Sequence, residues 1–339
     1  TPLQGWTIQL TSAGEVVDEQ QTDENGGYSF TGLLPGTYGI SEVLDEEWLQ
    51  TAPANNKYQI TVDYTDTVYD VDFMNTQLGS VTGTKWHDLN GNGVREDNEP
   101  ALSGVTVYLD SNKNGVLDGD EISTKSDEDG SYQFNELVAG SYDVREVMVK
   151  GWRQSYPGAV AGESHKMDLQ SGEDLTDIDF GNYQPGSIAG VKWHDLNSNG
   201  VFDVNSERGL PGWRIYLDLN QNGEVDAGDR QTVTDATGSY RFDGLTPGEY
   251  VVAEVIIPNW TQTFPRILGD GDTHSVTLQS GDKLTADFGN VLAFDLRGIK
   301  WNDLNGNGRR DAGEPGLADW TIFVDLIPNG LWIKVSRLR

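Results

Sequence analysis

The sequence repeats itself at an interval as long as a whole domain. The motif Lys-Trp-His/Asn-Asp begins at Lys85, Lys192 and Lys300, with spacings of 107 and 108 residues. The units of solenoid proteins are shorter, at roughly 20–50 residues, whereas a repeat of this length fits an independently folding domain. The sequence therefore predicts a row of separate domains rather than one continuous superhelix.

Landmarks later in the repeat keep the same phase and set the predicted boundaries. The closing motif Asp-Phe-x-Asn ends at Asn75, Asn182 and Asn290. The first unit lacks an opening segment with its first strand and calcium loop, and the last unit is only the opening segment of a further repeat. The landmarks divide the chain into four units, of which the middle two are complete: residues 1–78, 79–185, 186–293 and 294–339.

Within a repeat, apolar and polar residues alternate in short runs. Residues 105–109, 132–134, 142–144 and 165–169 follow this pattern, which is typical of β-strands with one buried face. Gly and Asn-Gly turns separate the runs, and no helical periodicity of useful length is present. We therefore predict an all-β fold, in which about seven strands per repeat form an immunoglobulin-like β-sandwich. In tandem, such domains would form an elongated rod.

Several twelve-residue segments have the ligand spacing of calcium loops. Residues 88–99, 110–121 and 303–314 fit the pattern D-x-[DN]-x-[DN]-G-x5-E. Calcium takes about six to eight oxygen ligands, and positions 1, 3 and 5 can supply them from side chains, position 7 from its carbonyl and position 12 from a bidentate carboxylate. The glycine at position 6 allows the sharp turn that a Cβ would obstruct.

Two further loops depart from the pattern at its last position. Loop 218–229 ends in Asp229, whose shorter side chain is expected to bind through one oxygen or a water. Loop 195–206 has Ser206 there and Glu207 one residue later, so its binding would need a bulge. The alternative for any single loop is an ordinary turn rich in Asp and Asn, but recurrence at matching positions favours calcium as the cofactor. The predicted ligands are Asp88, Asn90, Asn92, Val94, Glu99, Asp110, Asn112, Asn114, Val116, Glu121, Asp195, Asn197, Asn199, Glu207, Asp218, Asn220, Asn222, Glu224, Asp229, Asp303, Asn305, Asn307, Arg309 and Glu314.

The composition disfavours several classes of function. Aspartate and glutamate number 54 against 23 lysines and arginines, a formal charge of -31, which argues against binding to nucleic acid or anionic membranes. Cysteine is absent, so no disulfide stabilises a domain. No signal peptide and no membrane-spanning apolar run is visible. Neither a Ser/His/Asp set nor a cysteine nucleophile is present, and we predict that the protein is not an enzyme.

The motifs in order resemble those of a known family. Trp-His-Asp-Leu-Asn-Gly-Asn-Gly at 86–93, Gly-x-Tyr-x-Phe-like runs such as 130–134, and Gly-x-Tyr-x-Val-x-Glu at 140–146 are similar to the SdrD B-like domain of bacterial surface proteins. That family is related to the Cna B-type modules, and both are prealbumin-like β-sandwiches. The resemblance implies calcium-rigidified spacer domains, strung in tandem in the stalks of adhesins and surface fibres outside the cell.

The resemblance also implies a covalent cross-link. Cna B-type modules often carry an isopeptide bond between a lysine on the first strand and an asparagine on the last, assisted by a glutamate on a middle strand. A buried lysine loses its charge and becomes a nucleophile. The alternative is a surface lysine, a glutamate in a salt bridge and an asparagine that caps the last strand. The matching residues are Lys85, Glu146 and Asn182 in one repeat and Lys192, Glu254 and Asn290 in the next.

The two incomplete ends admit two interpretations. Residues 1–78 contain Glu42 and Asn75, the counterparts of Glu146 and Asn182, but no first-strand lysine, whereas the C-terminal segment supplies Lys300. One hypothesis is that residues 297–314 of one chain complete the sandwich of the next, with Lys300, Glu42 and Asn75 as an intermolecular isopeptide set. The other is an arbitrary cut through a longer array, which the similarity of residues 315–322 to residues 2–8 favours.

The functional prediction is a calcium-stabilised stalk or fibre segment of an extracellular surface protein, which could assemble head-to-tail into filaments. Its expected partners are neighbouring copies of itself or further repeats. The alternative is an array of adhesin or carbohydrate-binding modules with a host or glycan ligand. Aromatic residues more often pack in cores than form sugar platforms, which favours the stalk.

Overall fold

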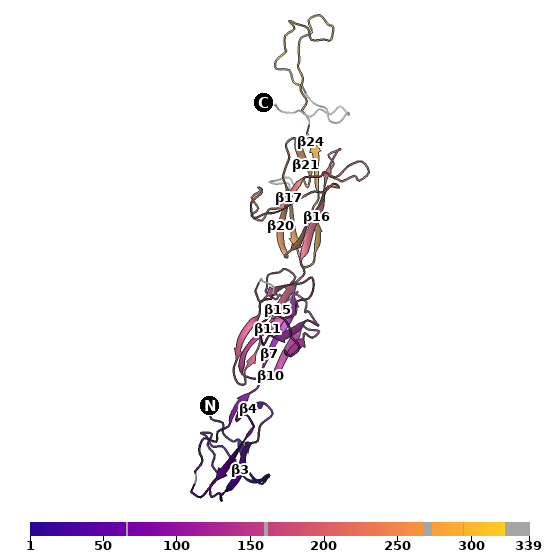
Figure 1. The fold of residues 1–339 in the computed structure, drawn as a ribbon. Coiled ribbons are helices and arrows are strands. Elements are labelled where there is room, and N and C mark those ends of the chain that lie inside the picture. Colours follow the sequence, from indigo (N-terminus) through magenta and orange to yellow (C-terminus); the bar gives the residue numbers. More distant parts are fainter. Residues whose placement is uncertain (66, 159–161, 267–272, 294, 323–339) are drawn as a thin grey trace.

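The computed structural model describes residues 1–65, 67–158, 162–266, 273–293 and 295–322. All of the regular structure in these residues is β, so the predicted all-β class is confirmed. Three sandwich units follow one another along a rod, with the N-terminus in the unit at one end and the C-terminal segment beyond the other (Figure 1). No helix among the described residues is long and apolar enough to cross a membrane.

The second domain contains two facing sheets. One has the strand order β10-β7-β15-β12, with β14 also paired to β7, and the other has the order β13-β11-β8-β9. Its strands are β7 (Gly79–His87), β8 (Thr106–Leu109), β9 (Ser123–Lys125), β10 (Ser131–Leu137), β11 (Gly140–Glu146), β12 (Arg153–Tyr156), β13 (His165–Leu169), β14 (Asp174–Leu175) and β15 (Phe180–Tyr183).

Side chains from both sheets of this domain fill the space between them. Tyr132 and Phe134 on β10 are buried while Gln133 between them is exposed, which is the alternation expected of a half-buried strand. They pack with Val81 and Phe180 in one core cluster. The period-two pattern in the sequence therefore determines which face of each strand is inside.

The third domain repeats this plan. Its sheets have the orders β19-β16-β24-β21, with β23 beside β16, and β18-β17-β20-β22. Its core contains Ile188, Ile215 and Phe288. Its strands are β16 (Gly186–His194), β17 (Arg214–Leu217), β18 (Arg230–Val233), β19 (Ser239–Leu245), β20 (Gly248–Glu254), β21 (Trp260–Phe264), β22 (His274–Leu278), β23 (Lys283–Thr285) and β24 (Phe288–Leu292).

In both complete domains the first strand lies in the middle of a sheet, where it pairs in parallel with the last. Lys85 on β7 lies opposite Phe180 on β15. Two residues before the lysine, β7 has Gly83, where an added Cβ would collide with the carbonyl oxygen of Ile178. Gly190 on β16 is in the same situation against Ala286. The glycine is therefore required by the close approach of the neighbouring backbone.

Among the described residues of the first domain, no strand occupies the place that β7 and β16 have in the other two. One sheet has the order β2-β1-β3-β5, and the remaining two strands form a separate pair, β4-β6. Its core cluster consists of Ile8, Leu10 and Ile40 with partly buried neighbours. Its strands are β1 (Thr7–Ser12), β2 (Glu15–Gln21), β3 (Gly36–Glu42), β4 (Trp48–Ala52), β5 (Lys57–Val62) and β6 (Met74–Gln77).

The C-terminal segment folds back on itself without forming a strand in residues 295–322. Trp301 forms an isolated bridge with Gly316, as Trp86 does with Ala101 and Trp193 with Gly209. This segment therefore reproduces the local turn that follows the first strand of a complete domain. Residues 323–339, the rest of the fourth predicted unit, lie outside the described residues.

Candidate calcium loops and buried lysine sites

Each predicted calcium loop is anchored by its first aspartate. Asp88 follows directly after β7, and its backbone N–H donates to the carbonyl of Asn182 at 2.9 Å. Its side chain is fully buried and accepts N–H groups from Gly91 at 2.6 Å and Gly93 at 2.7 Å. Gly93 has a φ of 74°, a conformation that favours glycine. The buried first carboxylate thus organises the turn around itself.

The last carboxylate of each loop accepts hydrogen bonds from two backbone N–H groups, those of the second and ninth residues of that loop. Glu99 accepts from the N–H of Leu89 at 2.7 Å and of Glu96 at 3.2 Å. Glu207 forms the equivalent bonds, with the N–H of Leu196 at 2.9 Å and of Asp203 at 3.0 Å. The extra residue in that loop is accommodated, and Glu207 takes the place of a twelfth-position ligand.

The shorter Asp229 also reaches this position. It accepts from the N–H of Leu219 at 3.2 Å and of Asp226 at 2.8 Å. Glu121 and Glu314 make the same pair of contacts in their loops. The five loops therefore share one closed geometry despite the departures in their sequences.

Sequence reasoning missed one acid in each loop. In loop 88–99, the asparagines at positions 3 and 5 donate their amide N–H groups to Glu96. The distances to Oε1 of Glu96 are 3.2 Å from Asn90 and 2.6 Å from Asn92. The ninth position of a calcium loop commonly binds through a water, and this spacing was the signal that could have identified the acid. The corresponding contacts involve Asp118, Asp226 and Asp311, and loop 195–207 has Asp203 at the same position.

The donor atoms of the loops fit a hard cation such as calcium, because all of them are oxygens. The side-chain oxygens of Asn90 and Asn92 accept the N–H groups of Asn92 at 3.0 Å and of Val94 at 2.6 Å, so both amides would have to give up these contacts to turn their oxygens toward a cation. The carbonyl of Val94 would supply a further oxygen. Val116, Glu224 and Arg309 occupy the same seventh position in other loops. Within the described ranges, no three His, Cys, Asp or Glu side chains gather closely enough to hold a metal ion.

The charges in loop 88–99 are close enough to affect one another. Burial raises the pKa of Glu99, hydrogen bonds from the N–H groups of Glu96 and Leu89 offset part of this rise, and the charges of Asp88 and Glu96 raise the pKa further. A buried carboxyl group such as that of Glu99, whose ionisation is disfavoured without a counterion, is a suitable setting for a bound cation.

The second loops of the two complete domains also differ in a residue that contacts them from a neighbouring strand. Asp110, the first residue of loop 110–121, has its carboxylate 2.7 Å from Nε of Arg145 on β11. The residue at the same position of β20, which pairs with Tyr216 as Arg145 pairs with Tyr108, is Ala253. Loop 218–229 therefore has no arginine at this place.

Loop 88–99 lies at the junction between the second and third domains. The carbonyl of Leu89 accepts the N–H of Ser280 at 2.8 Å, and the Ser280 hydroxyl lies 2.6 Å from Nε2 of His87. The same hydroxyl accepts the N–H of Gln184 in the linker at 2.7 Å. At Gly91, an added Cβ would come within 3.1 Å of Pro247. The conformation of this candidate calcium loop is thus linked by hydrogen bonds to the third domain.

The predicted lysine, glutamate and asparagine of the second domain meet in its interior. Lys85 is fully buried, with Nζ 2.6 Å from Oδ1 of Asn182 and 3.3 Å from Oε2 of Glu146. Asn182 donates its amide N–H to Oε2 of Glu146 at 3.1 Å. Burial lowers the pKa of Lys85 to about 8, although the Glu146 charge opposes this change. Burial likewise raises the pKa of Glu146.

The third domain brings the same three residue types together, although Nδ2 of Asn290 has no hydrogen-bond partner there. Nζ of Lys192 lies 2.9 Å from Oε2 of Glu254 and donates to Oδ1 of Asn290. Burial lowers the pKa of Lys192 to about 8. Trp213 places its ring 4.6 Å from this Nζ. Both domains therefore hold a lysine in an apolar site beside an amide and a carboxyl group.

The first domain contains two of the three groups. Asn75 donates to Oε2 of Glu42 at 2.8 Å, and burial raises the pKa of Glu42. Oδ1 of Asn75, the atom that receives lysine in the other domains, is buried without a hydrogen-bond partner. Lys300 is exposed, with Nζ 5.0 Å from the Trp320 ring, in the C-terminal segment at the far end of the rod from the first domain (Figure 1). The structure does not bring these three residues together within one chain.

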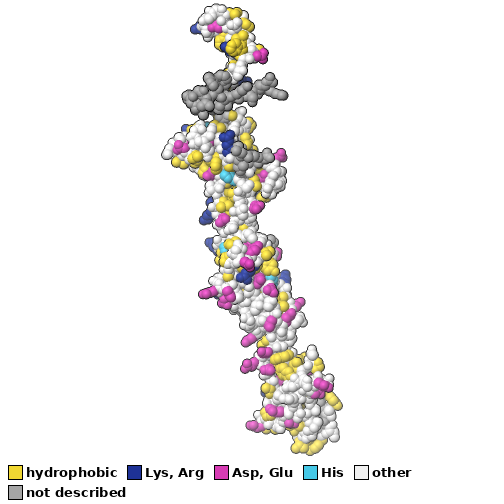
Figure 2. Space-filling view, turned by 180° about the vertical axis from the view of Figure 1, so that it is seen from behind, with side chains coloured by type: hydrophobic (Ala, Val, Ile, Leu, Met, Phe, Trp, Pro, Cys, Tyr) yellow, Lys and Arg dark blue, Asp and Glu magenta, His cyan; other side chains and the backbone are white. Residues whose placement is uncertain are grey.

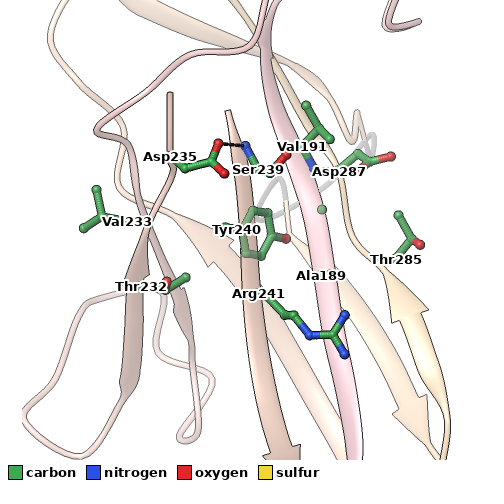
Figure 3. Close-up of a pocket in the computed structure, with 11 residues that line it drawn as sticks. Ala189, Val191, Thr232, Val233, Asp235, Ser239, Tyr240, Arg241, Thr285 and Asp287 are labelled. Carbon is green, nitrogen blue, oxygen red and sulfur yellow. Dashed lines mark hydrogen bonds between the residues drawn. The ribbon is translucent and has the colours of Figure 1, made fainter. Parts of the chain in front are cut away.

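Surface features give a carbohydrate-binding role little support. Acidic side chains are scattered along the visible face of the rod, with few basic ones among them (Figure 2). Trp86 and Trp193 are buried, so they form no exposed aromatic platform. A hollow in the third domain, drawn in Figure 3, has Asp235 and Asp287 at its edge. Both accept backbone N–H groups, from Ser239 and Val191 respectively, which is a structural role.

The fold and the loops together define a class of proteins, namely modular proteins built from prealbumin-like β-sandwiches in tandem. Residues 76–182 and 186–289, well over half of the chain, match the SdrD B-like domain. The chain belongs to that family, which confirms the resemblance seen in its motifs. Residues 1–77 match the prealbumin-like fold domain. The chain is thus a structural stalk segment of an extracellular, cell-surface protein.

Known proteins with similar sequences carry these repeats within much longer chains. Serine-aspartate repeat-containing protein F of Staphylococcus epidermidis is 28% identical over 333 residues, covering 88% of this chain and 19% of that protein. Serine-aspartate repeat-containing protein D of Staphylococcus aureus (strain MW2) is 30% identical over 314 residues, covering 85% and 22%. The chain therefore spans about a fifth of the length of these relatives.

Among solved structures, BcpA, the major pilin subunit of Bacillus cereus, is similar with a TM-score of 0.35 and 13% identity, over 86% of this chain and 95% of that chain. The Bacillus anthracis TIE protein has a TM-score of 0.33 and 18% identity, over 86% of this chain and 48% of that chain.

Proposed function

We propose that the chain is a stalk segment whose rigidity depends on calcium. The observation that carries this proposal is that the first and last acids of the same loop are buried in both complete domains. They are Asp88 and Glu99 in the second domain and Asp195 and Glu207 in the third. Carboxylates are seldom buried without a partner of opposite charge. A bound cation would supply that partner, and its loss would leave the acids to repel one another.

The position of loop 88–99 indicates what calcium would do for the stalk. The loop contacts the third domain through a hydrogen bond between Leu89 and Ser280. Loss of order in the loop would therefore weaken the contact between the two domains as well as the second domain itself. The role is mechanical, and no catalytic turnover is needed for it.

Thermal unfolding with calcium and with a chelator tests this function. A ligand that binds only the folded state stabilises it by about 2.7 kcal/mol at a hundredfold excess over its dissociation constant. We expect calcium to raise the melting temperature of the wild-type chain, and Glu99→Gln to reduce this rise. Asp97 is exposed in the same loop, and Asp97→Asn is the matched control for the loss of one charge. An equal melting temperature with calcium and with chelator would refute the proposal.

We also propose that the buried lysines of the second and third domains form isopeptide bonds with their asparagines. Nζ of Lys85 would attack Cγ of Asn182, forming a C–N bond while the bond from Cγ to Nδ2 breaks and ammonia leaves. Glu146 lies within reach of both groups and would carry the proton from lysine to the leaving nitrogen. The same step would join Lys192 to Asn290 beside Glu254.

Intact-mass measurement of the whole chain tests the bonds. The mass should be lower than the sequence mass by two molecules of ammonia, one for each complete domain. Glu146→Gln should restore one of them and leave the bond of the third domain in place. A mass equal to that of the unmodified sequence would exclude both bonds.

A further inference from the structure

The buried carboxylate of Asp110 has a cationic partner within the protein itself. Asp110 is the first residue of loop 110–121, and its side chain is fully buried. Its Oδ2 lies 2.7 Å from Nε of Arg145, which reaches it from the neighbouring strand β11. Buried carboxylates are seldom found without an opposite charge or several hydrogen-bond donors. Here a side chain of the same domain supplies the opposite charge.

The guanidinium of Arg145 is held through all three of its nitrogens. Nη2 lies 3.1 Å from Oδ2 of Asp143, whose side chain is also buried. Nη1 donates to the carbonyl of Gly162 at 2.7 Å. Only 18% of the Arg145 side chain is exposed. Because the guanidinium is a rigid planar fork, these contacts fix its orientation and keep its charge beside Asp110.

The same carboxylate organises the turn of the loop. Oδ2 of Asp110 accepts the N–H of Gly115 at 2.8 Å, and Oδ1 accepts that of Asn114 at 3.1 Å. Arg145 lies close to this turn, since a Cβ added to Gly115 would be 3.7 Å from Nη1. Arg145 therefore stabilises the anion on which the turn is built. This is the electrostatic role that the proposed function gives to calcium in the other loops.

The matching loop of the third domain has no such partner. It begins at Asp218, which is buried and whose N–H donates to the carbonyl of Val251 at 2.9 Å. Val251 thus stands where the second domain has Asp143, and Ala253 stands at the position of Arg145. Among the residues that the structure describes, no ion pair includes Asp218. The two domains therefore differ in both the arginine and the acid that aligns it.

We propose that Arg145 is a built-in counterion that keeps loop 110–121 closed without calcium, whereas loop 218–229 depends on the metal. The proposal refines the calcium-dependent stalk function, and it rests on that function only for the contrast with loop 218–229. Asp143 is a positioning residue, because its side chain acts through the guanidinium. When calcium is removed, the third domain would lose order in both of its loops, but the second domain only in loop 88–99.

Amide hydrogen exchange of the whole chain in the presence of a chelator, followed by NMR, tests the proposal. The reporters are backbone N–H groups that donate to loop carboxylates, namely Ser111 and Gly115 in the second domain and Leu219 and Gly223 in the third. After correction for intrinsic rates, the reporters of the second domain should exchange at least about tenfold more slowly. The reason is that opening loop 110–121 also breaks a charge-assisted contact.

Exchanging residues between the domains gives variants in both directions. Asp143→Val combined with Arg145→Ala copies the third domain and leaves no unpaired carboxylate at position 143. This double variant should lose the protection of loop 110–121 in chelator and regain it with calcium. Val251→Asp combined with Ala253→Arg is the reverse exchange, and it should slow the exchange of the third-domain reporters in chelator.

Arg153→Ala is the matched control, because it removes one exposed positive charge from β12 of the same domain. It should leave the exchange of both loops unchanged. The proposal would be overturned if loop 110–121 exchanged as fast as loop 218–229 in chelator, or if the second-domain double variant kept its protection. The response to calcium is read separately. If calcium failed to slow exchange in loops 88–99 and 218–229, the calcium function would fail, while the chelator comparison would still decide the role of Arg145.

Discussion

Nζ of Lys85 lies 2.6 Å from Oδ1 of Asn182, although the two residues are 97 positions apart in the sequence. Both side chains are buried, and Glu146 from the opposite sheet reaches them both. The contact joins the first strand of the domain to its last. A covalent bond at this place would prevent the two strands from separating under tension.

The rate of bond formation should depend on pH. The neutral amine is the nucleophile, and the pKa of Lys85 is lowered to about 8 by burial. Ammonia release after rapid refolding, followed by intact mass, should therefore accelerate as pH rises from mildly acidic values toward about 8. Lys166→Met, at an exposed position of β13, is the control and should not alter the profile. A rate that is flat across this range would contradict a buried lysine nucleophile.

The stability of a domain without the bond should change with pH in a defined direction. Between about 8 and the ordinary lysine pKa of 10.5, the unfolded chain still binds the proton that folded Lys85 has lost. Stability therefore rises with pH across this window. Denaturant titration of the Glu146→Gln variant at several pH values measures the slope, and adding Lys85→Met should abolish this contribution.

Replacing Arg145 should strengthen calcium binding by loop 110–121. The guanidinium pairs with Asp110 at 2.7 Å and competes with a cation for that carboxylate. We expect Arg145→Ala, which copies Ala253 of the third domain, to raise calcium affinity in the second domain by roughly three- to tenfold, a gain of the size of a partly exposed ion pair. Isothermal titration calorimetry checks this. Arg153→Ala on β12 is the control, and an equal effect there would show that the gain comes from net charge alone.

Glu207 should be a ligand, while Ser206 should not. Glu207 is buried and receives the N–H groups of Leu196 and Asp203, as Glu99 does in its own loop. Glu207→Gln should reduce the calcium-induced rise in melting temperature of the third domain, and Ser206→Ala should leave it unchanged. The opposite result would mean that the loop binds in the standard register without its bulge.

Gly83→Val should unfold the second domain selectively. A side chain at this position meets the backbone carbonyl of Ile178, which cannot move without breaking the parallel pairing of the first strand. The cost should exceed about 2 kcal/mol, measured by chemical denaturation. Gly104→Ala, where the structure has open space, is the control and should cost less, since only its φ of 74° opposes a side chain.

Ser280→Ala should loosen the junction between the second and third domains without altering their cores. The hydroxyl bonds to the linker at Gln184 and to His87. Small-angle X-ray scattering of the calcium-saturated chain should show a broader distribution of maximum dimensions for this variant. Ser275→Ala, at an exposed position of β22, is the control. Indistinguishable curves for the two variants would argue against a role of Ser280 in stiffening the rod.

The sequence by itself determined the class of fold, the repeat and the loops. Alternation of apolar residues and a period of one domain are local properties, and so is a twelve-residue loop, because its ligands all come from one turn of chain. The position of the ninth acid, as in Glu96, was equally local and could have been read from the same spacing. These features need no knowledge of how distant segments meet.

Only the tertiary structure decided which distant groups share a site. Arg145 reaches Asp110 because β11 pairs with β8, and Ser280 meets Leu89 because two domains abut; neither contact has a signature in the sequence. Likewise, the family resemblance identified Lys85, Glu146 and Asn182 as candidates, but these residues are buried only because the two sheets of the domain pack against each other around them. Desolvation and long-range pairing are properties of the packed chain, and no window of the sequence contains them.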